Sequence, residues 1–272
     1  MTIKENVEHK IAWEELMNSP DFAGQKSIIW DYRDRKKLAT FWMSDVHLGH
    51  RQCDEGLFNR NLEMIKRNKM PFADLGDLIE NATRNSVGAG VYDQESIADA
   101  QIEAAISKYE PVSDLLKSMQ IGNHELRSYI AGGINPTRMM AKRLGTKYGS
   151  PGMFHVIKVG KQTYHIYSTH GGSGATTTGG KFNSLKRMGD IFPDTDLVIQ
   201  GHSHDTLYHS RELKSCDNRG AIKTHKQHMV MNGAYLDWWG SYGQIKGYAP
   251  CNKGNAKITF HGEKKQVEVS FI

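Results

Sequence analysis

The sequence predicts an α/β fold built on mixed β-sheets, and two features of the chain carry this prediction. In the first half, a short apolar run, a polar turn and a helical pattern follow one another three times, which is typical of an α/β layer. In the second half, short alternating runs predominate, and a single clear helical pattern interrupts them. Side chains at such strand ends converge beyond the sheet, so the turns are where a functional site is expected.

The first half is expected to hold three short strands. They are Lys37–Ser44, Phe72–Leu75 and a run that ends at Gly122. Glu55–Asn68 has the apolar spacing of a helix. Gln94–Met119 also has helical character, and the helix is expected to bend or break at Pro111 because proline has no N–H to donate.

The second half is expected to be rich in strands. Phe154–Val159 and Thr163–Ser168 alternate around Gly160-Lys161 and predict a hairpin, and Lys181–Ile191 predicts a helix. The remaining expected strands are Leu197–Gln200, Thr206–Leu213, Gln227–Asn232, Lys257–Phe260 and Gln266–Phe271.

No repeat and no long linker rich in Pro, Gly or Ser divides the chain, so residues 1–272 are expected to form a single domain. Within it, residues 1–36 are predicted to be an N-terminal helical extension, with an amphipathic helix over residues 5–17. Residues 205–272 are predicted to supply the C-terminal strands that complete the fold.

The composition excludes several classes of protein. Hydrophobic residues make up 38% and charged residues 24% of the 272 residues, as in ordinary folded proteins. The three cysteines form no CxxC pair, which argues against a disulfide framework or a cysteine-built zinc site. Residues 1–20 lack the apolar core of a secretion signal, and no apolar run approaches the roughly 20 residues of a membrane span. A cytoplasmic protein without a membrane partner is therefore expected.

The chain has 13 histidines, and several of them stand in short polar motifs at predicted strand ends. These motifs are Ser44-Asp45-Val46-His47, Gly76-Asp77, Gly122-Asn123-His124-Glu125, Thr169-His170-Gly171 and Gly201-His202-Ser203-His204. Residues i and i+2 of an extended segment point the same way, so Asp45 and His47 could bind one ion, and so could His202 and His204.

The residue types in these motifs indicate a class of metal. Carboxylate oxygen together with imidazole nitrogen suits manganese, iron, zinc or nickel better than calcium. A glycine precedes Asp77, Asn123 and His202, and glycine lets the chain turn sharply out of a strand without a Cβ clash. Each motif taken singly is also common as a plain turn. The ordered set is what indicates a metal centre.

This ordered set spans residues 44–204 and resembles the calcineurin-like metallophosphoesterase superfamily. The resemblance implies two mixed β-sheets packed as a sandwich, flanked by helices, with two divalent metal ions at the sheet edge. The ligands that it implies are Asp45, His47 and His204 for the first ion, Asn123, His170 and His202 for the second, and Asp77 bridging the two. His124 is implied to face the substrate rather than to bind metal.

The implied chemistry is hydrolysis of a phosphomonoester or phosphodiester. Two divalent ions, with manganese favoured and iron, nickel or zinc as alternatives, polarise the phosphoryl oxygens and activate the hydroxide that bridges them. His124 is expected to assist the leaving oxygen. A Ser–His nucleophile at Ser168-Thr169-His170 is disfavoured because the chain has no GxSxG motif.

Substrate contacts are expected from residues beside the metal motifs. His50 lies just after the first motif, and Asn81 and Arg84 lie just after the Gly-Asp motif, although a plain loop role is an alternative for each. Glu125 is expected either to orient a ligand imidazole or to be a solvated helix acid. Residues 171–180, rich in Gly and Thr, are a lid, an anion-binding loop or a connector.

The expected partner is a phosphate ester, with a nucleotide or nucleic acid favoured. Asp45-Val46-His47-Leu48-Gly49 resembles the opening of exonucleases of the double-strand-break-repair type, whereas residues 232–250 resemble compact, uncharacterised bacteriophage members without a DNA-capping domain. Aromatic residues near the C-terminus would stack on bases if exposed, although a core position is favoured for them. They are Tyr235, Trp238, Trp239, Tyr242 and Tyr248. A DNA exo- or endonuclease and a catalytically silent scaffold are the alternatives.

Overall fold

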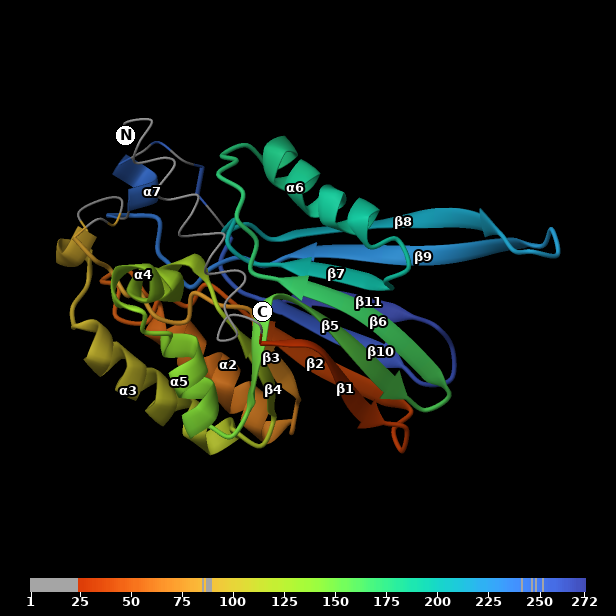
Figure 1. Ribbon diagram of the computed structural model, residues 1–272, viewed down its shortest axis with the longest axis horizontal. Helices are drawn as coiled ribbons and strands as arrows, with labels where there is room; N and C mark the ends of the chain where they lie inside the picture. The colour runs from red at the N-terminus through yellow and green to blue at the C-terminus, as the bar shows by residue number, and fades with distance from the viewer. Residues whose placement is uncertain are drawn as a thin grey trace.

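The computed structural model describes residues 24–84, 86, 90–240, 242–245, 247, 249–250 and 252–272. These residues form a mixed α/β structure in which 11 strands join in one sheet and helices pack on its outer faces (Figure 1). The strand order is β11-β10-β2-β3-β4-β5-β6-β7-β9-β8, and β1 pairs with β5 beside this path. The expected helix over residues 5–17 lies outside the described residues.

Each strand expected from the sequence has a counterpart in the structure. The first half contains β1 (Gln25–Tyr32), β2 (Lys37–Met43), α2 (Glu55–Arg67), β3 (Phe72–Asp74), η1 (Gly90–Asp93), α3 (Ala98–Tyr109), η2 (Glu110–Val112), β4 (Leu116–Gln120), α4 (Asn123–Gly132) and α5 (Pro136–Arg143). The second half contains β5 (Lys147–Val159), β6 (Gln162–Thr169), α6 (Thr178–Ile191), β7 (Leu197–Gln200), β8 (Leu207–Cys216), β9 (Ile222–Met231), α7 (Tyr242–Ile245), β10 (Ala256–His261) and β11 (Val267–Phe271).

Strand β5 joins the two halves of the sheet, and this is where the structure departs from the two separate sheets of the expected sandwich. Its first residues pair in parallel with β4, up to Gly149. From Gly152 onward it pairs with β6 in the antiparallel direction. A Cβ on Gly152 would lie 1.9 Å from the Tyr167 hydroxyl oxygen, so only glycine fits at this change of partner. The described strands therefore form one continuous sheet.

The sheet folds over onto its own inner face. Strands β10 and β6 are far apart in the sheet order, yet the rings of Phe260 and Tyr164 have centroids 4.9 Å apart. Buried side chains from both halves, including Trp42, Ile166 and Ile199, form one apolar cluster between them. This enclosed core fixes the relative position of the strand ends, and those ends carry the polar motifs.

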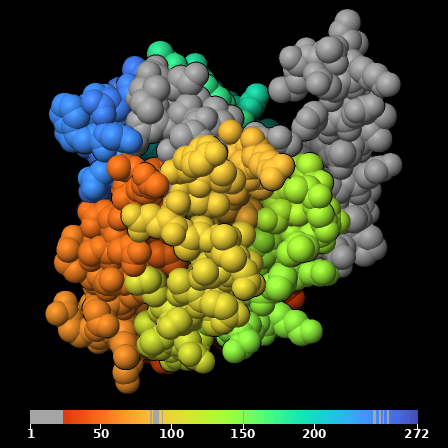
Figure 2. Space-filling view, turned by 90° about the vertical axis from the view of Figure 1, so that its left-hand side faces the viewer, coloured from red at the N-terminus to blue at the C-terminus, as the bar shows by residue number. Residues whose placement is uncertain are grey.

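Helices cover the outer faces of the folded sheet. Phe41 of β2 packs in a second apolar cluster with Phe58 of α2, Ile106 of α3 and Met140 of α5. Figure 2 views this side of the molecule and shows segments of α2 (orange), α3 (yellow) and α5 (green) as adjoining parts of the surface. Helix α6 covers Val198 of β7 on the other half. No helix within the described ranges is long and apolar enough to cross a membrane.

The expected break at Pro111 is confirmed, because α3 ends at Tyr109 and a 3₁₀ turn holds the proline. Two other expectations are wrong. The helix does not resume after the break, because β4 has begun by Leu116. The expected helical extension over residues 1–36 contains strand β1 at Gln25–Tyr32, which pairs with β5. The apolar side chains of β1 explain this difference, because Trp30 is buried in the inner core.

Candidate metal centre

The polar motifs lie in loops that leave the strands, and their backbone is not extended as expected. Asp45 and His47 both have positive φ, at 55° and 54°, and so do His202 and His204, at 66° and 49°. Asp77 has the same left-handed conformation, with φ of 54°. In each of these two motifs, residues i and i+2 both have left-handed backbone, so local turns and not an extended strand set the direction of their side chains. Such conformations cost about 1 kcal/mol or more per non-glycine residue and concentrate at functional sites.

Backbone hydrogen bonds hold the first two loops together. The Asp45 N–H donates to Gly76 O at 3.0 Å, and the His47 N–H donates to Asp77 O at 3.0 Å. The Leu48 N–H continues the pairing through Leu78 O. The loops after β2 and β3 therefore form a short ladder that fixes their side chains relative to each other.

The glycines of the motifs allow neighbouring loops to approach each other closely, and one of them also allows a sharp turn. Of the glycines before Asp77, Asn123 and His202, the first alone has positive φ: Gly76, at 102°. A Cβ on Gly122 would lie 2.1 Å from Asp77 Oδ1. A Cβ on Gly201 would lie 2.7 Å from Asp45 Oδ2. The glycines thus let neighbouring loops crowd against the buried carboxylates.

Asp45, His47 and His204 form the first group of side chains that could hold a metal ion. The Nε2 atoms of His47 and His204 lie 3.1 Å apart, and His204 Nε2 is 3.3 Å from Asp45 Oδ1. Burial, followed by the nearby His124, lowers the pKa of His47 to about 4. The ring is therefore neutral, as a metal ligand must be.

Asp77, His170 and His202 form a second such group. His170 Nε2 lies 3.2 Å from Asp77 Oδ2 and 3.0 Å from the side-chain oxygen of Asn123. Burial raises the pKa of Asp77, but His170 and His124 outweigh burial and hold the pKa well below its ordinary value. The structure thus brings together every side chain that the resemblance implies as a ligand.

The donor atoms fit a bound cation. His170 Nδ1 faces the Leu75 carbonyl at 3.0 Å and must donate to it, so a neutral His170 presents an Nε2 lone pair to the oxygens of Asp77 and Asn123. Three lone pairs cannot face one another without a positive charge between them. Atoms bound at about 2.1 Å to one octahedral ion are themselves roughly 3 Å apart, which is the spacing seen here. Without metal, a proton meets this need: burial lowers the pKa of His170, but Asp77 raises it to about 10.

His124 lies beside both groups, and its ring nitrogens already have partners. His47, Asp77 and His124 form a third set close enough to hold an ion. However, His124 Nδ1 contacts Glu80 O at 2.7 Å, and Nε2 accepts from Arg127 Nη2 at 2.8 Å. Burial lowers the pKa of His124, while Asp77 and Glu80 raise it by more. Both ring nitrogens of His124 therefore contact protein groups, and its expected position toward the substrate stays a prediction.

Glu80 is a site residue that the sequence analysis missed. Its Oε2 lies 3.1 Å from His47 Nδ1 and 3.3 Å from His124 Nδ1, and the side chain is 8% exposed. Burial raises the pKa of Glu80, but hydrogen bonds from His124 and His47 hold it far below the ordinary value. The signal in the sequence was an acidic residue three positions after Asp77 and directly before Asn81, one of the expected substrate contacts.

Glu125 and Asn81 fasten the backbone of the site. Glu125 accepts from the N–H groups of Asp77 and Gly122, both at 3.0 Å, so it orients backbone rather than an imidazole. Asn81 donates to His124 O at 2.6 Å and accepts from Ser128 Oγ at 2.8 Å. The Asn81 amide thus holds the backbone at His124, and its expected phosphate contact stays a prediction.

The other expected substrate contacts lie at the edge of the centre. His50 is 9% exposed, and its Nδ1 accepts from the Gln52 N–H at 3.0 Å. Arg84 is exposed in a turn, and its expected phosphate contact stays a prediction. Residues 171–177 form neither helix nor strand, and α6 starts at Thr178.

Ser168 takes no part in the centre. Its hydroxyl is fully buried, lies 2.7 Å from His155 Nε2 and donates to Gln120 Oε1 at 2.6 Å. His170, by contrast, is held by Leu75 and Asp77. The disfavoured Ser–His nucleophile therefore has no support in the structure.

The expected aromatic residues divide into buried and exposed positions. Tyr235 is fully buried and its hydroxyl accepts from Asn61, so it belongs to the core, as favoured. Trp239 is 74% exposed and lies edge-on to Trp238, with ring centroids 4.9 Å apart. The side chains of Tyr242 and Tyr248 lie outside the described residues.

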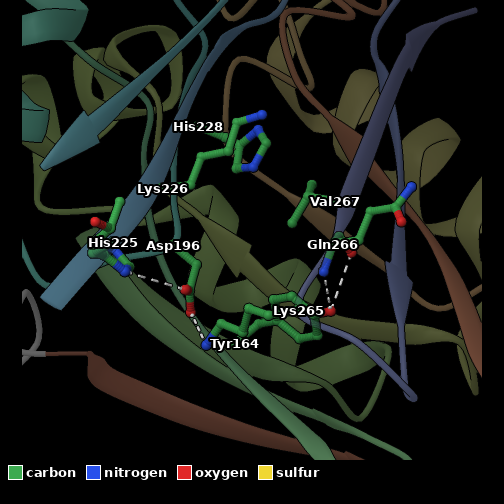
Figure 3. Close-up of a pocket in the computed structure, with 9 residues that line it drawn as sticks. Tyr164, Asp196, His225, Lys226, His228, Lys265, Gln266 and Val267 are labelled. Atoms are coloured by element: carbon green, nitrogen blue, oxygen red, sulfur yellow. Dashed lines mark hydrogen bonds and ion pairs between the residues drawn. The ribbon is translucent and has the colours of Figure 1, made fainter.

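A pocket of about 260 Å³ lies away from the metal centre, between β9 and the start of β11 (Figure 3). Asp196 lies in it, with Lys265 Nζ at 2.9 Å from its Oδ2 and His225 Nδ1 at 3.8 Å from its Oδ1. These charges compensate one another within the pocket. None of the predicted ligands lines it.

Comparison with known proteins adds three distant structures. No protein-family model and no curated protein matches the chain. A predicted phosphoesterase from Streptococcus pneumoniae shares 12% identity at a TM-score of 0.37, covering 86% of this chain and 90% of its own. Vps29 from Chaetomium thermophilum shares 12% sequence identity at a TM-score of 0.39, and the match covers 86% of this chain and 95% of Vps29. Vps29 from Entamoeba histolytica, solved with Zn²⁺, shares 12% sequence identity at a TM-score of 0.36, and the match covers 86% of this chain and 98% of that protein.

Proposed function

We propose that this protein is a dinuclear metal-dependent phosphoesterase. The observation that supports the proposal most strongly is the convergence of nitrogen and oxygen atoms that can bind a metal, seen at 3.0–3.3 Å in the contacts of His170 with Asn123 and Asp77 and of His204 with His47 and Asp45. Aspartate and histidine ligands in this proportion suit manganese, iron, zinc or nickel.

The residues divide into two ligand sets with one shared member. Asp45, His47 and His204 would hold one ion; Asn123, His170 and His202 would hold the other; Asp77 would serve both. When bound, such ions polarise the phosphoryl oxygens and activate a water molecule for in-line attack. Asp77 is suited to the shared position because its pKa is held well below the ordinary value, so it stays ionised.

His124 would assist departure of the leaving oxygen. Its side chain is 14% exposed, whereas Asp77 beside it is 1% exposed, so a substrate can reach the histidine. His124 Nδ1 is held by Glu80, whereas Nε2 accepts from Arg127 Nη2 and would have to leave that contact and carry a proton to serve an incoming group. A hydrogen bond or proton from this nitrogen would stabilise the charge that develops on the leaving oxygen.

A nucleotide or nucleic acid is our proposed substrate class. Trp239 is exposed and forms an aromatic pair with Trp238, and the Asp237 N–H donates to Gln52 O, two residues from His50. This arrangement ties an aromatic loop to the loop of the first metal motif. Exposed aromatic rings near a phosphate site are the usual platform for stacking a base.

The decisive test is hydrolysis by purified protein loaded with Mn²⁺. We expect cleavage of bis-p-nitrophenyl phosphate, and loss of that cleavage after treatment with a chelator. A panel of monoesters, diesters, cyclic nucleotides and oligonucleotides, run with Mn²⁺, Ni²⁺, Mg²⁺ and Zn²⁺, would then identify the substrate class. A metal-loaded protein inert on every member would support the scaffold alternative. Cleavage of DNA alone would support the nuclease.

A further inference from the structure

Arg127 lies next to the candidate site, and neither the motifs nor the ligand groups assign it a role. It stands four residues after Asn123 and three after His124 on α4, so its side chain is a neighbour of each on the helix surface. Its side chain is 21% exposed, compared with 8% for Glu80. Arg127 is therefore held by the site and still open to a ligand.

The contacts of Arg127 leave its positive charge incompletely matched. Nη2 donates to His124 Nε2 at 2.8 Å, and Nη1 donates to the Glu80 carbonyl at 3.2 Å. Its nearest carboxylate oxygen is Glu80 Oε1 at 3.5 Å, and the same carboxylate also serves His47. The shortest contacts of the guanidinium are thus with a ring nitrogen and a backbone carbonyl and not with a carboxylate. A guanidinium in that position prefers an anion.

Given the proposed phosphoesterase function, we propose that Arg127 binds a non-bridging oxygen of the substrate's phosphoryl group. The planar guanidinium matches phosphate oxygens and has more N–H donors than its present contacts use. If Nη2 turns from His124 to the phosphoryl oxygen, the His124 Nε2 atom becomes free to approach the leaving oxygen. One side chain thereby couples phosphate binding to release of the histidine.

Inorganic phosphate is the probe for this inference, because its binding can be measured without turnover. Arg127→Gln, Arg127→Lys and wild-type protein are loaded with Mn²⁺ and titrated with phosphate by isothermal calorimetry. We expect Arg127→Gln to bind phosphate roughly 10- to 100-fold more weakly, as for loss of a hydrogen bond to a charged group. The phosphate affinity of Arg127→Lys should lie between those of Arg127→Gln and the wild type, because lysine keeps the positive charge but lacks the planar, bidentate guanidinium. The exposed Arg60 on α2 supplies the matched control, and Arg60→Gln should bind phosphate like the wild type.

The outcomes separate this inference from the proposed function. Equal phosphate affinity in Arg127→Gln and wild type would overturn it, as would a wild-type protein that holds Mn²⁺ but binds no phosphate. Loss of Mn²⁺ in Arg127→Gln, measured by metal analysis, would also overturn it, since the residue would then support the metal centre. If the wild type binds phosphate but cleaves no ester, the proposed function fails while the role of Arg127 in phosphate binding stands.

Discussion

Glu80 Oε2 lies 3.1 Å from His47 Nδ1, and this contact decides which nitrogen of the ring faces the metal centre. The carboxylate accepts the Nδ1 proton, so Nε2 carries the lone pair and points toward His204 Nε2, 3.1 Å away. Carboxylates that hold a ligand histidine in this way fix its tautomer and raise its basicity. The same carboxylate oxygen lies 3.3 Å from His124 Nδ1, so one acid orients His47, a proposed ligand, and His124 together.

Replacement of Glu80 should therefore weaken metal binding without removing any ligand. In Glu80→Gln we expect Mn²⁺ affinity to fall about 10- to 100-fold, the usual cost of losing such a partner. Titration of metal into chelator-treated protein measures this. Glu63→Gln, at an exposed position of α2, is the control and should bind Mn²⁺ as the wild type does. Unchanged affinity in Glu80→Gln would show that His47 is oriented by other contacts.

Asp77→Asn and His124→Ala should separate metal binding from catalysis. Asp77 belongs to two of the groups that could hold a metal, so Asp77→Asn should lose both metal and activity. His124→Ala should keep metal and lose roughly 100-fold or more in kcat, the usual scale for a general acid. Metal content and hydrolysis of bis-p-nitrophenyl phosphate are measured on the same preparations. Loss of metal in His124→Ala would instead make His124 a ligand.

The convergence of the proposed ligands was predictable because it depends on residue types in sequence order. Parallel strands carry their following loops to one edge, and the sequence shows Asp77 and Asn123 directly after apolar runs. The geometry that makes the set work was not predictable. Positive φ at Asp45 and His204 arises from contacts between loops that are more than 150 residues apart, such as the His202 N–H donating to Asp45 Oδ2 at 2.9 Å.

The single sheet and strand β1 were missed for a similar reason. The bend in β5 depends on Gly149 and Gly152, which in the sequence look like an ordinary turn around Pro151. Strand Gln25–Tyr32 exposes most of its residues and buries Trp30, so its own pattern gives a weak signal. Glu80 could not be recognised as a partner of His47 without knowing that the loops after β2 and β3 pair through their backbones.

Gly122→Ala should disrupt the centre by crowding Asp77. An added Cβ would lie 2.1 Å from Asp77 Oδ1 and 2.3 Å from its backbone N, and neither atom can move without displacing the shared ligand. We expect loss of Mn²⁺ binding and a free energy of unfolding lower by about 1–3 kcal/mol. Gly132 ends the same helix with nothing within 4 Å of its would-be Cβ, so Gly132→Ala is the control. Full metal binding in Gly122→Ala would contradict the crowding argument.

The positive φ of His204 should lower the free energy of unfolding, and variants at this position allow that effect to be measured. Its φ of 49° is unfavourable for any residue with a Cβ. In metal-free protein, His204→Gly should therefore be about 1 kcal/mol more stable than His204→Ala, although both lack the imidazole. The exposed His209 of strand β8 serves as the control pair, and there the alanine variant should be the more stable one. Urea unfolding of the four variants gives both differences, and equal stability of the two His204 variants would exclude backbone strain.

His155 should make the stability of the protein depend on pH independently of the metal centre. It is fully buried, lies edge-on to Trp42 with ring centroids 4.9 Å apart, and contacts Ser168 Oγ at 2.7 Å. Burial lowers its pKa to about 3, so the folded state keeps the ring neutral while the unfolded chain takes up a proton below about pH 6.5.

The sign of this effect follows from which state binds the proton. The stabilisation is complete above pH 6.5 and declines as the pH falls toward 3, because only the unfolded state gains from protonation over that range. Relative to His155→Gln, which cannot titrate, the metal-free wild type should lose about 2 kcal/mol of unfolding free energy between pH 7 and pH 5. Urea unfolding of both proteins at each pH measures the difference, and the other histidines cancel because both proteins contain them. A difference that stays constant from pH 7 to pH 5 would mean that His155 is protonated in the folded core.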